Sequence, residues 1–136
     1  MGKKLVLDTN ILISALGWEG NARIILQKVI DGQFELLISA KQLEELLRAM
    51  NYPKFKFTED QKTRFISVLM EVATIVEVVH KADIIKEDPS DNMHLECALS
   101  GKADYIITGD NKHLLKLKVF EGIRIIKARE FLDQVR

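Results

Sequence analysis

The sequence places an aspartate at the point where each of two apolar stretches gives way to polar residues. Residues 3–16, KKLVLDTNILISAL, read as a buried strand that breaks at Asp8 before apolar residues resume at helical spacing. Residues 104–108, DYIIT, read as a second such strand, and Asp110 follows it. In open parallel α/β sheets the ligand crevice lies outside the carboxyl ends of the strands, so both aspartates are candidate site residues. Aspartate is also a preferred helix cap, and Asp8 could equally serve only to begin the helix that follows.

Further acidic residues occur on two predicted helices. Residues 88–91, DPSD, have the pattern of a helix start, with proline at the first helical position and Asp91 in the first turn. Capping alone would explain that pattern. A second helix, over residues 39–50, carries Glu44 and Glu45 outside its apolar stripe. The stripe consists of Leu43, Leu46, Leu47 and Met50.

Carboxylates gathered at one place repel one another, and a divalent cation would hold them together. Oxygen ligands alone favour Mg²⁺ or Mn²⁺ over zinc. Such a cation can lower the pKa of a bound water, orient it toward a phosphodiester and neutralise charge on the leaving oxygen, which is the chemistry of nuclease sites. The glycine-rich loops of nucleotide-binding sites are absent, and the histidines and the cysteine lack zinc-site spacing. The sequence therefore favours metal-assisted hydrolysis.

Strands and helices alternate along the chain. Besides the elements above, helices are predicted over residues 21–30, 58–70 and 113–117 and from residue 128, and strands over residues 34–38, 73–79 and 123–126. This alternation implies right-handed crossovers and a parallel sheet covered on both faces. We therefore predict an α/β fold, a three-layer α/β/α sandwich with a central, mostly parallel sheet, formed by a single domain over residues 1–136.

The charge balance limits how the chain could hold a nucleic acid. Of the 136 residues, 20 are Lys or Arg and 20 are Asp or Glu, so the formal net charge is zero. The chain thus lacks the global positive field that many nucleic-acid-binding proteins carry, and a local group of lysines would have to replace it. The candidates are Lys54 and Lys56, and Lys112, Lys116 and Lys118.

The start of the chain, its apolar runs and its cysteine content predict a cytoplasmic protein. The start, MGKKLVLDTN, has three apolar residues before charged and turn residues follow, unlike a signal peptide. No apolar run approaches the roughly 20 residues of a membrane span. Cys97 is the single cysteine and lies among helical apolar residues, where a core role is expected.

Taken together, these motifs resemble the PIN-domain family. The resemblance rests on LVLDTNILISAL, the helix over residues 39–50 with its acidic pair, DPSDNMHLECALSGKADYIITGD and NKHLL, and it spans nearly the whole chain. Within the family the chain is most similar to the small single-domain, VapC-like toxins of toxin–antitoxin pairs, which are metal-dependent ribonucleases. The resemblance implies a five-stranded parallel sheet and Mg²⁺ or Mn²⁺ held by four acids. These acids fall on Asp8, Glu45, Asp91 and Asp110.

The second acid is the one that the residues themselves leave open. The resemblance favours Glu45 because the family's glutamate usually directly precedes a leucine, whereas helix geometry keeps Glu44 as an alternative. Asn10 and Thr108 match polar positions that support the acids by hydrogen bonding. Asn92 stands where many relatives carry another acid, which would weaken a second metal position.

The resemblance implies a metal-dependent endoribonuclease that leaves a 5′-phosphate and a 3′-hydroxyl, acts as the toxin of a toxin–antitoxin pair, forms a homodimer and binds an antitoxin protein. Two alternatives stand beside it. One is a non-catalytic PIN-like module that binds RNA or protein. The other is a nuclease acting on DNA, because metal chemistry at a phosphodiester does not itself read the 2′-hydroxyl.

One aromatic residue follows the Asp8 turn. Trp18 lies in the segment LGWEGNA, bounded by Gly17 and Gly20. An exposed aromatic there could stack on a base of bound RNA. The alternative is that Trp18 packs in the core or at a dimer contact, because an aromatic ring contributes most energy when buried.

Overall fold

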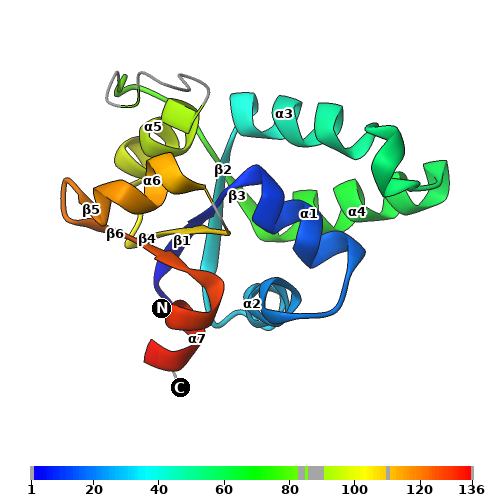
Figure 1. Ribbon diagram of the computed structural model, residues 1–136, viewed down its shortest axis with the longest axis horizontal. Helices are drawn as coiled ribbons and strands as arrows, with labels where there is room; N and C mark the ends of the chain where they lie inside the picture. The colour runs from blue at the N-terminus through cyan, green and yellow to red at the C-terminus, as the bar shows by residue number, and fades with distance from the viewer. Residues whose placement is uncertain (1, 83–84, 86–90, 110, 136) are drawn as a thin grey trace.

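The computed structural model describes residues 2–82, 85, 91–109 and 111–135. It confirms the predicted α/β fold, with one sheet between two layers of helices (Figure 1). No helix in the described ranges is both long enough and apolar enough to cross a membrane. The elements in chain order are β1 (Lys4–Leu7), α1 (Thr9–Gly17), α2 (Asn21–Ile30), β2 (Glu35–Ser39), α3 (Ala40–Met50), the 3-10 helix η1 (Pro53–Phe55), α4 (Glu59–Val72), β3 (Ala73–Val76), α5 (Asn92–Gly101), β4 (Tyr105–Thr108), α6 (Lys112–Leu117), β5 (Val119–Phe120), β6 (Ile123–Lys127) and α7 (Ala128–Gln134).

The sheet places β1 at its centre, in the order β3-β2-β1-β4-β6-β5. Strands β1, β2, β3, β4 and β6 run parallel. The chain moves from β1 to β2 and β3 on one side and then adds β4 on the other side of β1. This reversal is the topological switch point, where the crevice outside the strand ends receives ligands in such sheets. The carboxyl ends of β1 and β4 therefore flank the expected site.

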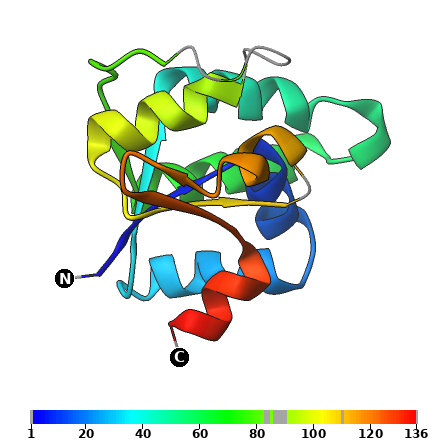
Figure 2. The same ribbon diagram turned by 60° about the vertical axis from the view of Figure 1, so that its left-hand side comes forward.

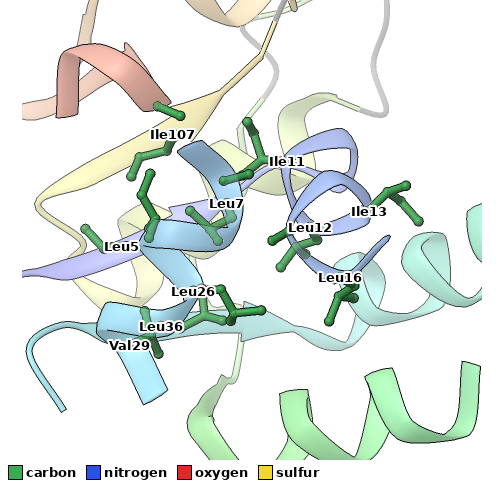
Figure 3. Close-up of a cluster of buried hydrophobic side chains, with 14 of the residues drawn as sticks. Leu5, Leu7, Ile11, Leu12, Ile13, Leu16, Leu26, Val29, Leu36 and Ile107 are labelled. Atoms are coloured by element: carbon green, nitrogen blue, oxygen red, sulfur yellow. The ribbon is translucent and has the colours of Figure 1, made fainter. Parts of the chain in front are cut away.

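Alternating side chains of the strands build two cores on opposite faces of the sheet. Leu5 and Leu7 belong to the larger core, under α1, α2, α3, α4 and α7, whereas Val6 belongs to the smaller one, under α5 and α6. Figure 3 shows Leu5 and Leu7 packed with side chains of α1 and α2, and Figure 2 shows α2 and α7 side by side. Burial on both faces fixes the strand register and hence the position of Asp8.

The sheet is mostly parallel, as predicted, but it has six strands and not the expected five. The additional strand, β5, runs antiparallel to β6 and is only 2 residues long. Glu121 and Gly122 connect the two strands with φ angles of 51° and 81°. Positive φ at both central residues is the geometry of a type I′ hairpin turn, which the short strand pair requires.

Helices α3 and α4 begin as predicted. The Ser39 and Thr58 hydroxyls accept hydrogen bonds from the backbone N–H groups of Gln42 and Gln61. The side-chain oxygens of the same glutamines accept the backbone N–H groups of Ser39 and Thr58, which completes two capping boxes. The predicted apolar stripe of α3 is wrong at Leu47, which is 42% exposed. Gln42 is buried in the helix instead, because its amide group makes hydrogen bonds at both ends.

Candidate functional site

Asp8 lies at the carboxyl end of β1 and begins α1. Its backbone N–H donates to the Ile107 carbonyl of the neighbouring β4 at 3.1 Å. One carboxylate oxygen accepts the Ile11 N–H at 2.8 Å, and the other accepts the Thr108 hydroxyl. The side chain is only 3% exposed. Asp8 is thus a helix cap and, at the same time, a buried carboxylate at the topological switch point.

Burial raises the pKa of the Asp8 carboxyl group above its usual value. The hydrogen bonds from Thr108, Ile11 and Gly109 lower the pKa and offset part of this effect. A buried carboxylate is costly to keep charged unless a positive charge compensates it. Asp8 is therefore a group whose environment favours a nearby cation.

We predict that Asp8→Asn raises the melting temperature at pH 7 in the presence of a chelator. The pKa of Asp8 is higher in the folded state than in the unfolded state, so ionisation opposes folding as pH rises through the folded-state value. The two proteins should converge below about pH 4, where the carboxyl group is protonated in both states. Thermal melts across this pH range test the prediction, with the exposed Asp60→Asn as the control. An unchanged or lower melting temperature for Asp8→Asn at pH 7 would contradict it.

Asp91 occupies the cap position of α5 and is 7% exposed. The Asn111 amide nitrogen donates to its Oδ1 atom at 2.8 Å. Asn111 Oδ1 accepts the Leu114 N–H at 3.0 Å as the cap of α6, which fixes the orientation of this amide. The loop after β4 therefore holds Asp91 in place.

Two sequence predictions lie outside the described residues. These are the helix start at residues 88–90 and the fourth acid, Asp110. Asp110 is the second residue after β4 in the sequence, between Gly109 and Asn111.

The two adjacent glutamates of α3 face different surroundings. Glu44 is exposed, whereas Glu45 lines the same pocket as Asp8 and Asp91. The Glu45 carboxylate accepts a bond from Arg48 at 2.6 Å. The Arg48 side chain is 66% exposed, and such surface ion pairs contribute little stability. Glu45 can therefore leave Arg48 and turn toward the pocket at small cost.

Asp8, Glu45 and Asp91 line one pocket of about 280 Å³. Its other described lining residues are Thr9, Asn10, Ala49, Tyr52, Met93, His94 and Asn111. This lining has three carboxylates and neither lysine nor arginine. In the described part of the chain no three histidine, cysteine or acidic side chains form a ready metal-binding group. The acids thus share one pocket without already converging on a single point.

His94 of the pocket lining is held by a buried hydrogen bond to Gln42. The Ser39 N–H donates to Gln42 Oε1 at 2.9 Å, so the Gln42 amide nitrogen faces the other way. That nitrogen lies 2.7 Å from His94 Nδ1. An amide nitrogen donates hydrogen bonds, so His94 Nδ1 is the acceptor in this pair. Gln42 and His94 thus form a buried polar pair, and His94 lines the pocket beside the acids.

Comparison with known proteins identifies the family. A family model described as PIN domain matches residues 4–112, more than half of the chain. The chain belongs to the PIN-domain family. This confirms the resemblance seen in the sequence. No curated protein matches this PIN domain in sequence.

A solved structure shares the fold of this PIN domain. It is the crystal structure of VapBC2 from Rickettsia felis bound to a DNA fragment from their promoter. One of its chains superposes with a TM-score of 0.65 at 16% identity, over 91% of the PIN domain chain and 98% of its own length. At this identity the similarity concerns the fold.

Asn92, which the sequence resemblance marks as a departure from an acid, is not among the described residues that line the pocket. Its side chain accepts the Ile85 N–H at 3.0 Å and donates to the Ile85 carbonyl at 2.9 Å. Asn92 is 5% exposed and pins the segment before α5 to the helix. An amide suits these two bonds because it both donates and accepts.

Sequence reasoning did not assign roles to Asn111, Gln42, His94 or Tyr52. A signal existed for Asn111, which directly follows the Asp110 turn and caps α6. The contact between Gln42 and His94 spans 52 residues of sequence, and local periodicity carries no signal for it. Cys97 is a core residue as predicted, and burial raises the pKa of its thiol to about 12, which makes it a poor nucleophile.

Proposed function

We propose that this PIN domain is an endoribonuclease that depends on Mg²⁺ or Mn²⁺. The observation that carries the proposal is the pocket itself. Three carboxylates line it, two of them buried, and its described lining contains neither lysine nor arginine. Carboxylates in such a place favour a bound divalent cation.

The donor set fits a hard divalent ion. Asp8, Glu45 and Asp91, with Asp110 by family resemblance, would hold it, and all of them offer oxygen. When bound, Mg²⁺ or Mn²⁺ supplies Lewis acidity toward water and the phosphodiester. The chain's own contribution is orientation. Thr108 and Asn111 hold Asp8 and Asp91 by hydrogen bonds, as partners of metal-binding carboxylates commonly do.

The biological role that we propose is that of a toxin in a toxin–antitoxin pair. The VapBC2 chain of similar fold comes from such a complex. On this analogy the PIN domain would act on RNA in the cytoplasm as a homodimer and would be held inactive by an antitoxin protein.

The proposal is tested by incubating the purified chain with labelled single-stranded RNA and DNA, with Mn²⁺ or with a chelator. We expect cleavage of RNA with Mn²⁺ only and 5′-phosphate ends on the products. Asp8→Asn is the inactive control. Equal cleavage of DNA would place the enzyme among DNA nucleases, and absence of cleavage with every substrate would favour a non-catalytic binding module.

A further inference from the structure

Four aromatic side chains form a contiguous group beside the pocket. We call this group, Trp18, Tyr52, Phe55 and Phe57, the aromatic platform. Phe55 stacks on Tyr52 with ring centroids 6.3 Å apart and on Phe57 at 5.6 Å. The Trp18 ring meets Phe55 at 5.9 Å and Phe57 at 5.7 Å. Residues from the end of α1 and from the connection between α3 and α4 therefore meet in one surface feature.

The platform has an anchored base and an exposed upper part. Phe57 packs edge-on against Phe65 of α4 at 5.3 Å, and a Cβ atom at Gly17 would come within 2.9 Å of the Phe57 ring. Trp18 and Tyr52, by contrast, are 49% and 41% exposed. The rings below hold these two rings in place while much of their own surface faces solvent. A fixed and exposed aromatic ring is prepared for stacking with another planar group.

The platform is continuous with the proposed active site. Tyr52 lines the pocket that contains Asp8, Glu45 and Asp91. Its backbone N–H donates to the Ala49 carbonyl at 3.1 Å, which fixes it to the end of α3. Asp8 and Trp18 are the two caps of α1, whose nine residues span about 14 Å at the standard helical rise. A strand of nucleic acid that enters the pocket would thus reach the platform within a few nucleotides.

The charges around the platform are mixed. Lys54 Nζ lies 5.1 Å from the Phe55 ring centroid, and Lys56 is exposed nearby in sequence. Glu19 and Asp60 are also exposed in the flanking sequence. The lysines can contact phosphates, and the two acids oppose their charge in the same segments. We therefore expect ring stacking to provide much of the affinity, which is the mode of binding that suits unpaired bases.

We propose that Trp18 and Tyr52 form a base-stacking subsite for single-stranded RNA next to the scissile phosphate. This inference rests on the proposed nuclease function and names its substrate class. Bases of duplex RNA are already stacked in the helix and offer no free face to the platform, so the substrate would be a single-stranded segment, a loop or an end.

Trp18 provides its own test because it is the only tryptophan in the chain. A short single-stranded RNA of mixed sequence is titrated into the full-length Asp91→Asn protein with Mn²⁺ present, and tryptophan emission is recorded. We expect saturable quenching by single-stranded RNA and little effect of the same sequence as a duplex. Equal quenching by single-stranded and duplex RNA would overturn the subsite. So would an unchanged tryptophan emission when single-stranded RNA is bound. Emission that changes with protein concentration alone would also overturn it and would mark Trp18 as a contact between two copies.

Variants then separate stacking from folding. In the same background Trp18→Ala should weaken RNA binding about 5- to 150-fold, the range expected for loss of one stacked base, and Trp18→Phe should restore most of it. Ile24→Ala is the matched control, because Ile24 is 48% exposed on α2 and does not line the pocket. Melting temperatures identify any variant that fails to fold. If Trp18→Ala fails to fold, the fluorescence titration still tests the subsite, because it uses a protein in which Trp18 is unchanged.

A cleavage assay on the wild-type chain keeps the two proposals distinguishable. RNA cleavage without quenching in the inactive background would retain the nuclease and remove the subsite. Quenching by single-stranded RNA without cleavage in the wild type would retain the subsite and remove the nuclease.

Discussion

Asp91→Asn should reduce metal-dependent RNA cleavage by at least about 100-fold. Loss of a residue that only supports a metal ligand costs up to about 100-fold, and loss of a ligand itself should cost no less. Asp8→Asn should have an equal effect. Each change removes one negative charge from the pocket and leaves the shape of the side chain unchanged, so a divalent ion would be held less tightly. The measurement is the initial rate of cleavage of a labelled single-stranded RNA at fixed Mn²⁺.

A control at the other end of the sheet makes this result specific. Asp104 precedes β4 at its amino end and accepts the Lys4 N–H at 2.8 Å. Asp104→Asn should cleave RNA like the wild type. On family resemblance Asp110→Asn should be as inactive as Asp91→Asn. Wild-type rates in any of the three site variants would remove that residue from the proposed site.

The second large effect is expected at the acidic pair of α3. Glu45→Gln should lose about 10- to 100-fold in cleavage and in Mn²⁺ affinity, whereas Glu44→Gln should retain both. Neighbouring side chains on a helix point about 100° apart, so only one of the two glutamates can face the pocket. Glu45 lines it and Glu44 is exposed.

Arg48 offers a further check on this assignment. Because the Glu45 carboxylate has to leave Arg48 to reach a bound ion, Arg48→Ala should not reduce cleavage. Loss of activity in Glu44→Gln with full activity in Glu45→Gln would show that the helix presents the other acid to the substrate.

Local sequence patterns were sufficient for the elements that carry the acids. The apolar run before Asp8 predicts a buried strand, since continuous apolar runs are typical of strands that are covered on both faces. Helices do cover both faces of the central sheet. Helices were predicted to begin at residues 39 and 58, where a serine and a threonine are preferred cap residues, and the structure has a capping box at each start. The position of Asp8 at the crevice follows from these local features and from the rule for parallel sheets.

The contacts that complete the pocket depend on distant residues. Thr108 reaches Asp8 across 100 residues of sequence, and Asn111 reaches Asp91 across 20. The expectation for Leu47 was wrong because hydrophobic periodicity gives no weight to a buried amide such as Gln42, whose partners are Ser39 and His94. Strand β5 was missed because it has two residues, too few to show the alternation of apolar and polar side chains by which a strand is predicted.

The most direct test of the central claim, that these acids hold a divalent cation, is a titration with Mn²⁺ followed by electron paramagnetic resonance of the free ion. It does not depend on choosing the right RNA. We expect saturable binding by the wild-type chain, binding weakened at least about 10-fold in Asp8→Asn, and unchanged binding in Glu44→Gln. Absence of binding by the wild type, or equal binding by Asp8→Asn, would contradict it.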